Sequence, residues 1–104
     1  MQVVNLKVNF SKTAEKNLNT ILSFIEARWS KKSKEIYLVK FHKAISIISM
    51  NPEIFPKSSV NKKYRKCVIT KQSSLLYSFG SNEIRIYIIF DTRQDPNKIK
   101  KDIK

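Results

Sequence analysis

Residues 64–91, YRKCVITKQSSLLYSFGSNEIRIYIIFD, decide the fold of this chain. They contain three runs of apolar and β-branched residues, at 66–70, 74–79 and 84–91. Short polar segments separate these runs, which is typical of neighbouring antiparallel strands. We therefore predict a three-stranded antiparallel meander. Its second turn is expected at Gly80, the only glycine in the chain, which can adopt a positive φ without steric cost.

The third run alternates, and this alternation predicts which side chains share a face of the sheet. One face is expected to contain Ile84, Ile86, Ile88 and Phe90. The other is expected to contain Arg85, Tyr87 and Ile89. The meander is therefore predicted to present one mainly apolar face to a covering layer.

Two helices are predicted upstream, after an alternating strand at residues 3–10. Ser11 can cap the first helix, which runs to about Trp29 with apolar residues at helical spacing. A polar joint at residues 30–32 follows, and then a second apolar stripe that ends before Asn51 and Pro52. So short a joint predicts an antiparallel helical hairpin.

These elements predict an α+β fold: an N-terminal strand, an antiparallel two-helix hairpin, and then the three-stranded antiparallel meander. The hairpin is expected to pack on one face of an antiparallel sheet and to leave the other face partly open. Residues 51–63, with two prolines, predict an exposed loop. A length of 104 residues favours one domain, residues 1–104.

Charge is the first indication of function. The chain has 21 Lys and Arg against 8 Asp and Glu, a formal net charge of +13. Residues 1–56 contribute +5 and residues 57–104 contribute +8. Such a surplus attracts polyanions, so nucleic acid, a ribosome or an acidic protein would all suit as partners. The alternative is that the lysines only keep the helix surfaces solvated.

Several function classes are disfavoured. The apolar runs are far shorter than the roughly 20 residues of a membrane helix, and no signal-peptide pattern is present, so we expect a cytoplasmic protein without membrane contact. Cys67 and His42 are the only residues of their kinds. We therefore expect no disulfide, no metal site and no cofactor, with Cys67 as a packed core thiol and His42 as an ordinary helix residue.

Basic residues near the strand ends are the best candidates for a site. Arg65 and Lys66 open the first meander strand, and Arg93 follows the last one. Guanidinium groups at strand ends could converge on one rim and bind phosphate or carboxylate with two donors each. Ordinary solvated charge is the alternative for each residue taken singly.

The sequence resembles the RelE/ParE superfamily of bacterial toxins along nearly its whole length. Four segments support the resemblance: FSKTAEKNLNTILSFIEARW at 10–29, KAISIISMNPEIFP at 43–56, YRKCVITKQSSLLYSF at 64–79, and IRIYIIFDTRQDP at 84–96. The resemblance implies the growth-inhibiting toxin of a type II toxin–antitoxin module, of the kind associated with plasmid stabilisation. It also implies neutralisation by a cognate acidic antitoxin. Members like ParE inhibit DNA gyrase, whereas members like RelE cut messenger RNA on the ribosome.

Departures from the nuclease pattern favour the ParE-like activity. Ser74 stands where such nucleases commonly have an arginine, Cys67 occupies a position suited to a basic residue, and no Tyr or His follows Arg93. We therefore expect a toxin that acts through DNA gyrase, with a degenerate or absent nuclease centre. The alternative is a metal-independent, ribosome-dependent endoribonuclease. Its catalytic residues would be Arg65, Lys66 and Arg93, with proton transfer by Lys66, Lys63 or Tyr87.

Overall fold

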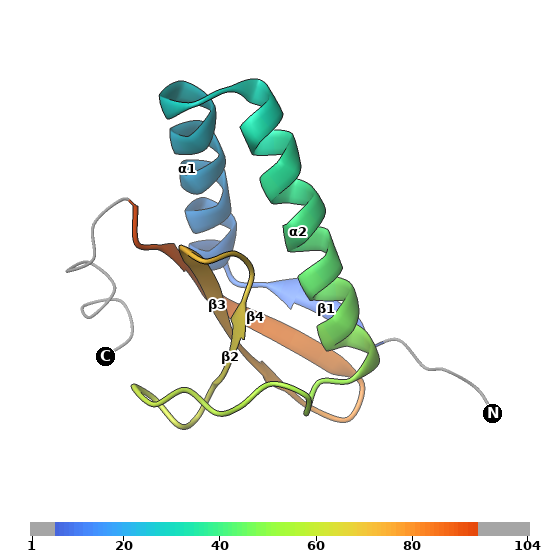
Figure 1. The fold of residues 1–104 in the computed structure, drawn as a ribbon. Helices are drawn as coiled ribbons and strands as arrows, with labels where there is room; N and C mark the ends of the chain where they lie inside the picture. Colours follow the sequence, from blue (N-terminus) through green and yellow to red (C-terminus); the bar gives the residue numbers. More distant parts are fainter. Residues whose placement is uncertain (1–5, 94–104) are drawn as a thin grey trace.

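A computed structural model describes residues 6–93 of the chain. Its elements follow the predicted order (Figure 1). They are β1 (Lys7–Phe10), α1 (Lys12–Arg28), α2 (Lys31–Met50), β2 (Arg65–Val68), β3 (Ser73–Phe79) and β4 (Glu83–Asp91). The predicted α+β class and element order are confirmed. The first part of the predicted strand 3–10 lies outside the described residues.

Serine side chains begin both helices. The Ser11 Oγ accepts a hydrogen bond from the Ala14 backbone N–H at 2.9 Å, and the Ser30 Oγ accepts one from the Ser33 N–H at 3.0 Å. Each satisfies an amide that has no partner within the helix. Because Ser30 is the cap, the predicted joint is shorter than expected, and Lys31 already belongs to α2.

The sheet is mixed, which corrects the prediction of a purely antiparallel one. Its strand order is β1-β4-β3-β2. The meander strands pair antiparallel, but β1 pairs parallel with β4, with Val8 opposite Ile84. The physical reason is the connection: β1 leads into the helical hairpin, and a long crossover returns the chain to the same sheet in the same direction.

A β-bulge interrupts β4. The register of β3 against β4 shifts between Leu76, which pairs with Ile88, and Tyr77, which pairs with Ile86. Tyr87 is therefore the extra residue of the bulge. Simple alternation cannot detect such an insertion, because the sequence stays uniformly apolar across it.

The bulge corrects the predicted face assignment. Ile84 and Ile86 lie in the core beneath the helices, and Ile89 lies there with them. Ile88 and Phe90, which were predicted on that same face, instead belong to a cluster on the opposite face. The helix-facing set is thus Ile84, Ile86 and Ile89.

Both turns of the meander differ in detail from the prediction. No described glycine has a positive φ, so the expectation for Gly80 is wrong; its N–H donates to the Glu83 carbonyl at 2.9 Å and closes the turn in an ordinary conformation. The first meander strand ends at Val68 rather than residue 70. Hydrogen bonds of Ile69 and Thr70 with Ser73 bend the chain there instead.

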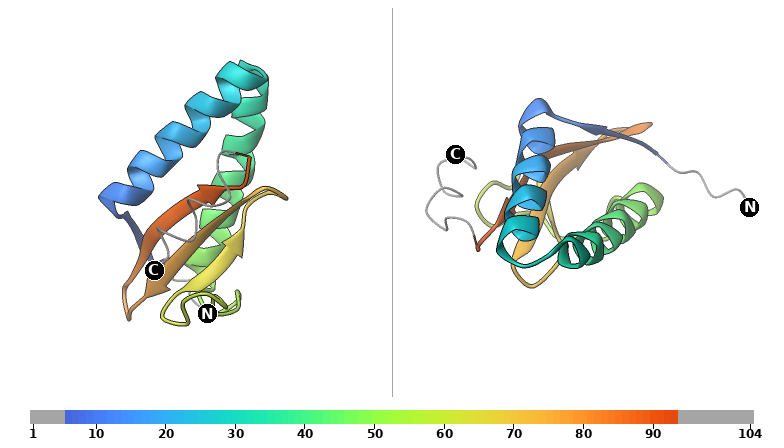
Figure 2. Two further views of the ribbon diagram at one scale, coloured as in Figure 1. Left: turned by 90° about the vertical axis from the view of Figure 1, so that its left-hand side faces the viewer. Right: turned by 90° about the horizontal axis from the view of Figure 1, so that it is seen from above.

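The main core lies between the helical hairpin and one face of the sheet (Figure 2). Leu75 and Tyr77 of β3 are completely buried on this side, as is Cys67 of β2. On the opposite face, Leu76 and Ile88 are buried as well. That face was predicted to be partly open, but aromatic rings cover its centre.

Buried polar groups join α2 to the end of the sheet. The Tyr37 hydroxyl bonds the Ser73 Oγ at 2.7 Å, and the Ser73 Oγ in turn donates to the Phe90 carbonyl at 3.1 Å. Because the Ser73 hydroxyl donates its only proton to the Phe90 carbonyl, the Tyr37 hydroxyl is the donor in its bond with the Ser73 Oγ. This chain of two bonds satisfies three polar groups in the interior and fixes α2 against β3 and β4.

Tyr37→Phe tests this chain of bonds. The substitution keeps the ring but leaves the Ser73 oxygen without its donor, so we expect the free energy of unfolding to fall by about 1–2 kcal/mol. Urea denaturation measures the change. Tyr64→Phe, in a half-buried stacked ring, is the matched control and should change stability by less than ~0.5 kcal/mol. Equal losses in both variants would contradict the assignment.

Burial also raises the pKa values of three weak acids in the core. The pKa of Cys67 rises from 9.0 to about 11, and the pKa values of Tyr37 and Tyr77 rise from 10.0 to about 12. The main cause in each case is loss of water around the charged form. All three groups therefore stay neutral in the folded protein at ordinary pH.

These shifts predict a loss of stability in alkali. Above pH 9 the unfolded chain releases protons that the folded chain still holds, so the free energy of unfolding decreases as pH rises toward 12. Denaturation midpoints measured across this range check the trend. In Cys67→Ala the decrease between pH 9 and about 11 should be less steep than in wild type. Superimposable pH profiles for the two proteins would show that Cys67 does not contribute.

Candidate functional site

Arg65 has a structural environment. It starts β2 and pairs with Tyr77 of β3. Its Nη1 donates to the Phe55 carbonyl at 2.7 Å and to the Glu53 carbonyl at 3.3 Å, and its guanidinium lies 5.7 Å from the centroid of the Phe79 ring. Arg65 thus holds the loop that follows α2 against the sheet.

Lys66 points to the opposite face of the sheet from Arg65. Cys67 is part of the core under the helices, so strand alternation places Arg65 on the helix side and Lys66 on the other. The Lys66 ammonium lies 5.9 Å from the centroid of the Phe90 ring, which belongs to the outer cluster. Lys66 is exposed and available to an anion on that face.

Arg93 is bound to a buried carboxylate. Its Nε donates to the Asp91 Oδ1 at 2.8 Å, and its Nη2 donates to Oδ2 of the same group. This hydrogen-bonded pairing raises the pKa of Arg93 and keeps it charged. The guanidinium also lies 5.3 Å from the centroid of the Trp29 ring, on the helix side of the sheet.

The three candidate residues do not converge, so the predicted shared rim is wrong. β2 and β4 both run antiparallel to β3, so the start of β2 and the end of β4 lie at opposite ends of the sheet. Along β3, Tyr77, the partner of Arg65, lies four residues from Ser73, the partner of Asp91, which is a span of about 13 Å. Sequence alone shows both arginines next to strand ends without showing which ends meet.

A basic hollow surrounds Arg65. It has a volume of about 210 Å³ and is lined by Lys57, Lys62, Lys63, Arg65, Tyr77, Ser78 and Phe79. Four of these seven residues are cations, and three are lysines from the loop between α2 and β2. Like charges so close together favour an anionic ligand that relieves their repulsion.

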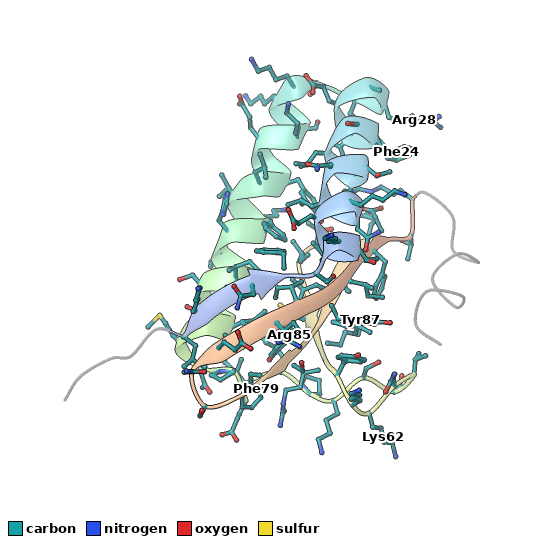
Figure 3. The ribbon with its side chains drawn as sticks, turned by 180° about the vertical axis from the view of Figure 1, so that it is seen from behind. Phe24, Arg28, Lys62, Phe79, Arg85 and Tyr87 are labelled. Atoms are coloured by element: carbon teal, nitrogen blue, oxygen red, sulfur yellow. The ribbon has the colours of Figure 1, made fainter. Side chains whose placement is uncertain are left out.

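The outer face of the sheet combines aromatic and basic side chains. The rings of Tyr64 and Tyr87 stack with centroids 4.4 Å apart and an interplanar angle of 1°, and they pack against Leu76 and Ile88. The Lys63 ammonium lies 5.9 Å from the centroid of the Tyr64 ring. In Figure 3, Tyr87 and Arg85 lie along β4, with Lys62 below them. Strand alternation does not predict this cluster, because the β4 bulge brings Tyr87 and Ile88 to one face.

A third feature is a cleft between the helical hairpin and the turn that joins β2 to β3. It has a volume of about 290 Å³ and is lined by Ile25, Trp29, Ser33, Ile36, Tyr37, Lys40, Thr70, Gln72 and Arg93. Its walls come from the C-terminal end of α1, the N-terminal half of α2 and the turn between β2 and β3. The cleft therefore combines apolar surface with two cations, Lys40 and Arg93.

Other chemistry has little basis in residues 6–93. Within them, no group of three or more His, Cys, Asp or Glu could hold a metal ion. Cys67 is completely buried, and its raised pKa keeps it a thiol. His42 is exposed on α2, with its ring against Phe41. In the same part of the chain, no helix is long and apolar enough to cross a membrane.

Solved structures of bacterial toxins have the same fold. The chromosomal ParDE toxin–antitoxin system of P. aeruginosa is similar with a TM-score of 0.71 at 11% identity, over 83% of this chain and 95% of that one. The RelBE2 complex of Mycobacterium tuberculosis gives 0.58 at 18% identity, over 86% and 94%. The E. coli DinJ-YafQ complex gives 0.51 at 14% identity, over 89% and 99%.

Sequence comparison identifies the family. Among curated proteins, none matches the chain. The family model described as the ParE toxin of the type II toxin-antitoxin system parDE, however, matches residues 8–96. That range includes all six elements except the first residue of β1. The chain therefore belongs to the ParE toxin family of type II toxin–antitoxin systems, within the RelE/ParE superfamily.

Proposed function

We propose that this chain inhibits growth in the cytoplasm by acting on DNA gyrase, and that a cognate antitoxin neutralises it. The family match supports the ParE-like activity over the nuclease activity of the wider superfamily. The observation on which the proposal rests most directly is the separation of Arg65, Lys66 and Arg93, because a nuclease centre built from these residues would need them together.

The environments of Arg65 and Arg93 also argue against a nuclease centre built from these residues. Arg65 is engaged with backbone carbonyls, and Arg93 is engaged with a buried carboxylate. A cation that stabilises a strained phosphate must be free to approach it. Both guanidinium groups therefore have structural partners with which a phosphate would have to compete.

The antitoxin partner is proposed from charge and from the relatives. A net charge of +13 favours an acidic partner. Similar folds occur in the ParDE system of P. aeruginosa and in the RelBE2 and DinJ-YafQ complexes, all of which are described as toxin–antitoxin assemblies. We expect the partner to be encoded in the reading frame next to that of this chain.

Purified protein tests the choice of target. We expect it to inhibit DNA supercoiling by gyrase and to leave messenger RNA intact in a ribosome-dependent cleavage assay, since no cation cluster is assembled from the three candidate residues. The neighbouring gene product should reverse the inhibition. Robust messenger RNA cleavage with normal supercoiling would overturn the proposal.

The second candidate function is a ribosome-dependent endoribonuclease that uses the outer face of the sheet. The observation that favours it is the Tyr64–Tyr87 stack beside Lys63, with Lys66 over the Phe90 ring of the same outer cluster. Aromatic rings next to lysines are suited to single-stranded RNA, which stacks its bases and places its phosphates on cations.

Paired substitutions separate the two candidates. If the outer face cleaves RNA, Lys66→Ala should lower the cleavage rate about 10²-fold or more, because a cation near the phosphate is lost. Arg93→Ala, on the other face and at the far end of the sheet, should cleave like wild type after correction for any unfolded fraction. Under the gyrase proposal, wild type and both variants leave RNA intact. Lys66→Ala should then inhibit supercoiling as wild type does.

A further inference from the structure

The basic hollow around Arg65 has no acidic partner. Lys57, Lys62 and Lys63 come from the loop between α2 and β2, and Arg65 begins β2. The three lysines are exposed, whereas Arg65 is half-buried. Within residues 6–93, none of the four makes an ion pair, and no acidic residue lines the hollow. Four positive charges therefore surround one depression of the surface without a carboxylate to neutralise them.

Hydrogen bonds hold the lysine loop in a closed shape. The Ser58 N–H donates to the Tyr64 carbonyl at 2.8 Å, and Lys57 forms an isolated β-bridge with Arg65. Ser58 is only 3% exposed, and its hydroxyl oxygen accepts a hydrogen bond from the Val60 N–H at 3.2 Å. Because the two ends of the loop are joined, the lysines stay around one hollow although their charges repel each other.

Arg65 adds a fixed charge beside the lysines. Its Nη1 donates to the backbone carbonyls of Glu53 and Phe55, which are neutral acceptors, so the positive charge of the guanidinium is not cancelled. A lysine has a flexible stem and three rotatable donors. The exposed lysines can therefore contact an anion directly, while Arg65 attracts it and keeps its own bonds to the loop.

The surroundings of the hollow indicate which anion it suits. Lys63 lines the hollow, and its ammonium also lies 5.9 Å from the centroid of the Tyr64 ring, which stacks on Tyr87. Lys62 lies below Tyr87 on the same side of the molecule (Figure 3). Cations next to aromatic rings suit a polynucleotide, whose phosphates bind the cations while its bases can stack on the rings. Carboxylates of an acidic protein would use the cations alone.

We propose that the hollow around Arg65 binds backbone phosphates of DNA, and that the toxin thereby contacts the DNA that gyrase holds. The second part rests on the proposed function, whereas DNA binding by the hollow can be measured without gyrase. Contacts to phosphates position a protein on DNA and do not read its base sequence. Each phosphate that a lysine neutralises releases counterions, so the affinity should fall steeply as salt is added.

Fluorescence anisotropy of a labelled DNA duplex, titrated with the protein at several salt concentrations, measures this binding. We expect Lys62→Gln/Lys63→Gln to raise the dissociation constant about tenfold or more at low salt. The slope of log affinity against log salt should become less steep by about 2, because two phosphate contacts are lost. Both side chains are exposed, so the variant should fold, and circular dichroism checks this.

The matched control is Lys31→Gln/Lys32→Gln. It removes the same charge from another adjacent and exposed pair, at the start of α2. The joint before α2 and the loop before β2 lie at opposite ends of the molecule (Figure 1). The control should bind DNA within about twofold of wild type at the same salt concentration. Equal losses in the two double variants would show that net charge alone attracts DNA, and would overturn the site.

Two further measurements test the location and the ligand. Lys66→Gln removes a cation from the outer cluster, outside the hollow. A larger loss of DNA affinity in this variant than in Lys62→Gln/Lys63→Gln would place DNA on the outer cluster and contradict the inference. Labelled polyglutamate is the second probe. If it binds more tightly than DNA and loses affinity in Lys62→Gln/Lys63→Gln, the hollow binds an acidic protein, and the inference is wrong.

A supercoiling assay separates the inference from the function beneath it. Lys62→Gln/Lys63→Gln should need about tenfold more protein than wild type for half-inhibition of gyrase, if the same phosphate contacts are made there. If this variant binds DNA and inhibits gyrase as wild type does, the inference fails and the proposed function stands. If wild type binds DNA through the hollow but does not affect gyrase, the proposed function fails and the phosphate site stands. Weaker DNA binding with unchanged inhibition overturns the contact with gyrase-held DNA.

Discussion

The structure depends on the burial of β3 on both of its faces. Leu75 and Tyr77 contact the core beneath the helical hairpin, whereas Leu76 between them lies in the outer cluster. A strand buried on both sides must be central, so β2 and β4 have to flank it. The hairpin then covers one face, and the loop residue Tyr64 contributes to the cover of the other.

The bulge at Tyr87 gives the two faces different chemical character. It returns Ile89 to the helix side and leaves Tyr87 and Ile88 together on the outer side. The outer face thereby gains a tyrosine stack beside lysines. The helix side instead has its cations at its two ends, Arg65 at one and Arg93 at the other.

Because of this separation, the chain has several basic surfaces instead of one surface that contains Arg65, Lys66 and Arg93 together. Charge is distributed over the hollow around Arg65, the outer face and helix α2, whose lysines lie on the same helix as the exposed Ile36 and Val39. Each surface combines lysines with a different neighbour: loop backbone, aromatic rings or exposed aliphatic side chains. A partner can therefore cover one of them without occupying the others.

The sequence by itself determined the element order, the Ser11 cap of the first helix and the family, because apolar periodicity and a capping serine are local properties. Only the tertiary structure decided the parallel pairing of β1, the bulge at Tyr87 and the separation of Arg65 from Arg93. Strand pairing joins residues that are far apart in the chain. A one-residue bulge within an apolar run does not change the apolar pattern from which a strand is predicted. The location of the candidate site could not be predicted for the same reason, since it depends on which strand ends meet.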